Sequence, residues 1–147
     1  MKIDALNLGI IKRLREGRRS FTKIADELDI TEKTARTRTG QLVREGVLEI
    51  TGLINPETIP GHSLIFVGVK LNTMDLIKKG SEFSKLKGVV SVNVVTGQFD
   101  LIVTVLLNQE FQVLEFYSEE VSKIEDVQSV ETFVSYKGYN SNVPYVL

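Results

Sequence analysis

The chain has 147 residues, 42% of them apolar and 25% charged, which is typical of a globular protein with one ordinary domain or two small ones. It contains no cysteine, which excludes disulfide frameworks and thiolate zinc sites. It contains one histidine, and we expect no metal or cofactor. Charged residues interrupt the apolar N-terminus, MKIDALNLGIIKRLREG. We therefore expect neither a signal peptide nor a membrane span, and a cytoplasmic protein.

The charge is unevenly distributed along the chain. Residues 1–50 carry eleven basic and eight acidic side chains, whereas residues 51–147 carry seven basic and eleven acidic ones. A basic first third joined to an acidic remainder favours a polyanion-binding module attached to a domain with another task. A simply solvated surface is the alternative.

The first fifty residues predict three helices. The first begins after Asp4, a candidate N-cap, and ends at Glu16-Gly17. Its apolar face consists of Ile3, Leu6, Ile10, Ile11 and Leu14. The second spans Thr22 to Leu28, and the third runs from the capping residue Thr31 to about Glu45, where Gly46 stops it. Three short helices with a tight turn before the last are the helix-turn-helix plan.

The segment 51–62 reads as a linker, because Gly52, Asn55-Pro56 and Pro60-Gly61 interrupt regular structure. A short strand is expected near Leu48–Leu53, which would make the first domain of the winged type. We therefore predict domains at residues 1–50 and 63–147.

Residues 63–147 alternate between β and α patterns. Apolar, β-branched runs predict strands at 64–71, 89–95, 99–107 and 127–136, and Thr96-Gly97-Gln98 suits a hairpin. Helical spacing predicts helices over 75–86 and 111–124. The order βαββαβ is the ferredoxin-like arrangement, so the chain is expected to be of the α+β class.

This sheet is expected to self-associate. Two helices cover one face of a four-stranded sheet, yet the strands carry apolar residues on both faces, as Leu101, Val103 and Val105 alternate with Ile102 and Leu106. A second apolar face needs cover from another subunit.

The third helix is the candidate DNA-reading element, since a helix-turn-helix places its last helix in the major groove. With Ala35 and Leu42 inward, Lys33, Arg36 and Thr37 point outward. Arg36 can offer a fork to a guanine edge, Thr37 can contact a phosphate or a thymine methyl, and Lys33 suits a phosphate. The alternative is that these side chains only solvate an exposed helix.

The run GRRSFTKIADELDITEKTARTRTGQLVREGVL resembles the helix-turn-helix signature of the Lrp/AsnC family of transcriptional regulators. The matching features are Gly17-Arg18, Ile24-Ala25, Leu28, Thr31, Thr34, Arg38, Leu42 and Gly46-Val47-Leu48. Arg38 matches the family's most regular basic residue in this helix. Its side chain either supports the helix or contacts a phosphate. The candidate contacts to double-stranded DNA are thus Thr31, Lys33, Thr34, Arg36, Thr37 and Arg38.

The resemblance extends through the second domain. Residues 94–101, VVTGQFDL, are similar to the family's glycine-aromatic-aspartate hairpin, and the strand 127–134 keeps a threonine, Thr132. The family implies an amino-acid or related small-molecule effector near this hairpin, with assembly into dimers and octamers. The candidate effector contacts are Gly97, Gln98, Asp100 and Thr132. Backbone N–H groups around Gly97 suit a carboxylate and Asp100 an ammonium. Alternatively, Gly97 only permits the turn and Asp100 binds backbone amides.

Two other functions compete with an effector-responsive regulator. An architectural DNA-binding protein would have the same sequence features without an effector. Sirohaem decarboxylases resemble the same family, but their chemistry needs a base where Asp100 stands, and only His62 is available. We expect His62 to be a linker residue and the protein not to be an enzyme.

Overall fold

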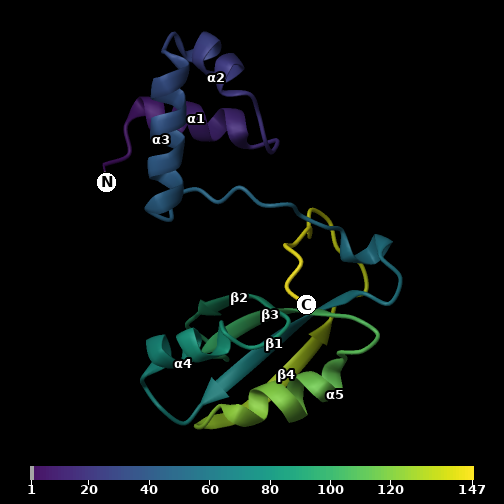
Figure 1. Cartoon of the computed structure of the whole chain (residues 1–147). Helices are drawn as coiled ribbons and strands as arrows, with labels where there is room; N and C mark the ends of the chain where they lie inside the picture. Colours follow the sequence, from purple (N-terminus) through teal and green to yellow (C-terminus); the bar gives the residue numbers. More distant parts are fainter. Residues whose placement is uncertain (1) are drawn as a thin grey trace. The chain divides into compact units, whose positions relative to one another are not determined.

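The computed structural model describes residues 2–147 and divides into two compact units, Met1–Gly52 and Leu53–Leu147. The first contains three helices and the second a four-stranded antiparallel sheet with helices along it (Figure 1). The second unit follows the order βαββαβ that its sequence pattern predicts. In the described part of the chain, every helix is too short or too polar to cross a membrane.

The first unit is built from α1 (Ala5–Leu14), α2 (Phe21–Leu28) and α3 (Glu32–Arg44). Two of these helices start at side-chain caps: Asp4 accepts a hydrogen bond from the Asn7 N–H at 2.8 Å, and Thr31 accepts one from the Thr34 N–H at 3.1 Å. The helices enclose a small core of buried apolar residues, namely Ile10, Leu14, Ile24, Ala25, Ala35 and Leu42. This core fixes which face of α3 remains outside.

Left-handed residues end two of these helices. Asp29 closes α2 with φ +52°, and Gly46 follows α3 with φ +68°. Aspartate tolerates this region better than most residues, because its short polar side chain can hydrogen-bond locally. The turn between α2 and α3 therefore stays tight without a glycine.

The strand expected near Leu48–Leu53 does not form. The segment is irregular up to Ile54, which makes an isolated antiparallel bridge with Val143. Ile50 and Leu53 are largely exposed. A strand needs a hydrogen-bonding neighbour, and within the chain this segment has none, so the expected wing is absent from the described structure.

The second unit carries β1 (Ser63–Leu71), β2 (Val89–Val94), β3 (Leu101–Leu107) and β4 (Val127–Val134) in the order β2-β3-β1-β4. A 3₁₀ turn, η1 (Pro56–Thr58), precedes β1, and α4 (Leu76–Phe83) connects β1 to β2. The second connecting helix is irregular: α5 (Val113–Glu115) continues as a π-helical turn, η2 (Phe116–Glu120), and a 3₁₀ turn, η3 (Val121–Lys123). Both helical connections are nevertheless where the apolar spacing predicts them.

One face of the sheet holds the main core. Alternate residues of β1 and β3, namely Ile65, Val67, Val69, Leu101, Val103 and Val105, are buried against the helical layer. Phe83 of α4, Phe111 and Phe116 of η2 fill the space between the layers. Figure 1 shows α4 and α5 along the same side of the sheet.

The opposite face is only partly open, which modifies the expectation of a bare second face. At one end, Val143 of the C-terminal segment packs with Leu64 and Leu106, and the three form a small buried cluster. Elsewhere on this face, Phe66 and Phe133 sit opposite each other on β1 and β4 and remain partly exposed. The chain thus covers part of the face itself and leaves an aromatic part uncovered.

Candidate DNA-binding and effector sites

Four of the six candidate DNA contacts gather on one surface of α3. Lys33, Thr34, Thr37 and Arg38 line a shallow hollow of about 250 Å³, together with Gln41. Helical periodicity places these five positions on one arc, because residues three and four apart share a face. Gln41 was not among the candidates, although its spacing of four from Thr37 was a signal for it. Hydroxyl, amide and cationic groups on one exposed helix face suit base edges and phosphates.

Arg36 lies on the flank of α3 rather than in this hollow. Its guanidinium donates to Glu32 at 2.7 Å and stands over the Phe21 ring, 4.7 Å from the centroid. The hydrogen bond from Arg36, with a second from Thr22, lowers the pKa of Glu32. Arg36 is therefore engaged with its own unit through an ion pair and a ring contact.

Arg38 connects α3 to the start of α1. Its guanidinium donates to the Asp4 carboxylate at 2.7 Å and to the Asn7 side-chain oxygen at 3.2 Å. The Asn7 N–H and Arg38 together lower the pKa of Asp4. Since Asn7 is fully buried, Arg38 satisfies an interior polar group and has a structural role in the unit. The remaining candidate, Thr31, caps α3, and its hydroxyl lies 2.8 Å from that of Thr34.

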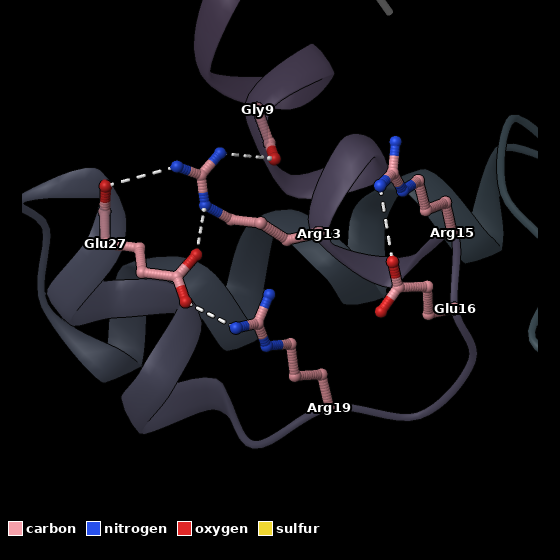
Figure 2. Close-up of polar contacts among 6 residues, drawn as sticks. All are labelled: Gly9, Arg13, Arg15, Glu16, Arg19 and Glu27. Carbon is pink, nitrogen blue, oxygen red and sulfur yellow. Dashed lines mark hydrogen bonds and ion pairs between the residues drawn. The ribbon is translucent and has the colours of Figure 1, made fainter.

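Several cations of the first unit are already neutralised by acids. Figure 2 shows Arg13 donating to the Gly9 carbonyl and to Glu27, whose carboxylate also accepts from Arg19, while Arg15 pairs with Glu16. Within residues 2–147, the basic side chains of this unit without an ion pair are Lys2, Lys12, Arg18, Lys23, Lys33 and Arg44. Of the six candidate contacts, only Lys33 therefore carries an uncompensated positive charge.

The hairpin between β2 and β3 brings Gly97, Gln98 and Asp100 together. Gly97 has φ +132°, a conformation that favours glycine, and the residue is exposed to solvent. The Asp100 carboxylate accepts from the Leu71 N–H at 2.8 Å and from the Lys70 ammonium at 3.1 Å. The Leu71 N–H and then Lys70 lower the pKa of Asp100. The carboxylate thus fastens the hairpin to the end of β1.

Thr132 does not join this group. It pairs with Val67 in the sheet and so shares the helix-covered face, where its hydroxyl lies 2.5 Å from that of Tyr117. His62 is also elsewhere: its Nδ1 lies 3.1 Å from the Pro60 carbonyl and its Nε2 3.4 Å from the Tyr145 hydroxyl. Among residues 2–147 no group of His, Asp and Glu side chains could hold a metal ion.

Comparison with known proteins extends over nearly the whole chain. The model of the Lrp/AsnC ligand binding domain matches residues 64–144. An uncharacterised HTH-type transcriptional regulator of Pyrococcus abyssi is 28% identical over 136 residues, covering 91% of this chain and 86% of the relative. The structure of Escherichia coli AsnC superposes with a TM-score of 0.71 at 18% identity, covering 94% of this chain and 95% of AsnC. The structure of the Neisseria meningitidis transcriptional regulator NMB0573 in complex with L-Met superposes with a TM-score of 0.71 at 18% identity. The superposition covers 99% of this chain and 96% of that regulator.

Proposed function

Because the chain belongs to the Lrp/AsnC family of transcriptional regulators, we propose that it binds double-stranded DNA through α3 and responds to a small-molecule effector held by its second unit. The family is regulatory and not enzymatic, which removes the decarboxylase alternative. The observation that carries the proposal is the polar surface of α3 around Lys33, in the more basic part of the chain. A DNA-binding regulator works where the DNA is, so we place it in the cytoplasm.

We assign the helix-turn-helix to α2, the Asp29 turn and α3. In this motif the last helix enters the major groove and phosphates fix its register. Thr37 and Gln41 offer a methyl group and an amide to base edges, as thymine and adenine require. Lys33, at the start of α3, contacts a phosphate. Thr31 and Thr34 shape the helix start, and Arg36 flanks the surface.

The Lys33 assignment predicts a specific salt response. Lys33→Ala should weaken binding to operator and random duplexes alike and lower the magnitude of the salt slope, d log K/d log[salt], by about 1, because one fewer counterion is released. Fluorescence anisotropy of the full chain on a labelled duplex, at several salt concentrations, measures this. Lys12→Ala is the matched control, since Lys12 also makes no ion pair within residues 2–147 but lies on α1. Equal slopes for wild type and Lys33→Ala would contradict the proposal.

For the effector we propose the hairpin around Gly97 and Gln98. Open backbone N–H groups there suit the carboxylate of an amino acid. An ionised carboxylate accepts about four hydrogen bonds, so Asp100 keeps capacity for an ammonium group beside its contacts to Lys70 and Leu71. Thr132, the fourth candidate contact, has its hydroxyl on that of Tyr117. The L-Met complex of the Neisseria regulator supports an amino acid as the class of effector.

We also propose that the uncovered part of the sheet, around Phe66 and Phe133, is where copies of the chain associate into dimers and then octamers. A dimer would present two α3 helices to half-sites one helical turn, or a multiple, apart. Light scattering after gel filtration measures the assembly, and a monomeric mass at micromolar concentration would refute it.

An architectural protein without an effector is the competing function. A thermal-shift screen of the twenty amino acids separates the two, because a ligand that prefers the native state raises the midpoint. Selective stabilisation that Gly97→Val removes supports the sensor. No shift with any amino acid favours the architectural protein.

A further inference from the structure

A hollow in the first unit lies on the side of α3 away from the proposed DNA-reading surface. Its volume is about 640 Å³, within the range of small-molecule pockets. It is formed by the end of α1, the start of α2, the flank of α3 and the segment that follows. Val43 lines it, two positions and so about 160° around α3 from Gln41, which is on the reading surface.

The lining combines an apolar floor with two cations. Leu14, Phe21, Val43 and Ile50 supply the apolar surface. Val43 and Ile50 are 45% and 44% exposed, although both are large apolar residues. Apolar side chains that are left accessible in a concave site favour an occupant with a hydrocarbon body.

Arg18 and Arg19 supply the cations. Arg18 makes no ion pair with any residue in 2–147, and Arg19 uses one terminal nitrogen on Glu27, as Figure 2 shows. A guanidinium pairs with a carboxylate through two parallel hydrogen bonds. No Asp or Glu lines the hollow, so an ammonium group would find no partner there.

We propose that this hollow binds a small hydrophobic carboxylic acid that lacks an α-ammonium group, such as a branched-chain 2-oxo acid. Arg18 holds the carboxylate, Arg19 assists, and the hydrocarbon chain lies on Val43, Phe21 and Ile50. The site is separate from the hairpin proposed for the amino-acid effector. It would give the regulator a second input, directly at the unit that carries α3.

Phe21 connects the occupant to α3, because this residue lines the hollow and the Arg36 guanidinium of α3 lies over its ring. A ligand in the hollow also contacts the segment after α3 through Ile50. Binding should therefore order that segment against the three-helix unit.

Isothermal titration of the full chain tests the proposal with a matched pair of probes, 4-methyl-2-oxopentanoate and leucine, which differ only at the α-carbon. The oxo acid should bind the wild type, and Arg18→Ala should weaken it about tenfold or more, because a charge-assisted pair is lost. Arg15→Ala is the control, since Arg15 pairs with Glu16 outside the hollow. Leucine binding, wherever it occurs, should not respond to Arg18→Ala.

A second pair of variants separates the hollow from general charge effects. Val43→Glu places a carboxylate beside Arg18 and should compete with the oxo acid, so that binding is lost. Val47→Glu is the control, because Val47 is equally exposed, at 45%, and does not line the hollow. Circular dichroism checks that all four variants keep their helices. The proposal is overturned if the wild type fails to bind the oxo acid. It is also overturned if Arg18→Ala or Val43→Glu binds the oxo acid as well as the wild type does. The proposal is also overturned if the wild type does not bind the oxo acid and Val43→Glu forms a smaller oligomer than the wild type. That result would assign the hollow to contact with a second copy of the chain.

Discussion

Replacing Arg38 by alanine distinguishes a structural role from a DNA contact. Arg38 donates to the Asn7 side-chain oxygen, and no other hydrogen bond to that oxygen exists within residues 2–147. Asn7 is fully buried, so the variant leaves a polar group unsatisfied in the interior. A buried acceptor without a partner costs about 1–3 kcal/mol, which corresponds to about a 5- to 150-fold change in an opening equilibrium. The ion pair with Asp4 is largely exposed and should add little.

Hydrogen exchange measured by mass spectrometry is the suitable assay, because it reports the opening of each unit separately. Amides of α1 and α3 should exchange faster by that factor in Arg38→Ala, while amides of the sheet should be unchanged. Arg44→Ala is the control, since Arg44 is exposed on α3 and makes no ion pair within residues 2–147. Unchanged protection of α1 in Arg38→Ala, combined with weaker DNA binding, would refute the structural role and return Arg38 to the DNA contacts.

Two further predictions concern the second unit. Asp100→Asn should lower the thermal midpoint at pH 7. The pKa of Asp100 is lowered by the Leu71 N–H and then by Lys70. The ionised carboxylate therefore stabilises the folded state at pH values above the unfolded pKa, which is near 3.9. This stabilisation is lost as the pH falls through the lower pKa of the folded state. The difference from wild type should therefore shrink below about pH 4, and a constant difference would contradict the ionic role. Val143→Asp puts a charge into a buried cluster and should weaken the C-terminal segment by about 2 kcal/mol or more. Trypsin should then cleave faster after Lys137, whereas the exposed Asn142→Asp should be cut like wild type.

The sequence alone was sufficient for the features that depend on neighbours along the chain. The caps Asp4 and Thr31 precede the helices they start, and apolar spacing located α1, α2, α3 and all four strands. Such signals are local, because a cap acts within its first turn and a period within its own element. The hairpin group of Gly97, Gln98 and Asp100 was predictable for the same reason, since these residues are adjacent.

The tertiary structure alone decided which partners the candidate side chains meet. Arg38 reaches Asp4 and Asn7 across more than thirty positions. Thr132 contacts Tyr117 because its pairing with Val67 turns it to the helix-covered face. A strand's alternation leaves two possible faces, and strand register selects one of them. The segment Leu48–Leu53 has the composition of a strand but stays irregular, since pairing requires a neighbour that a single chain does not supply.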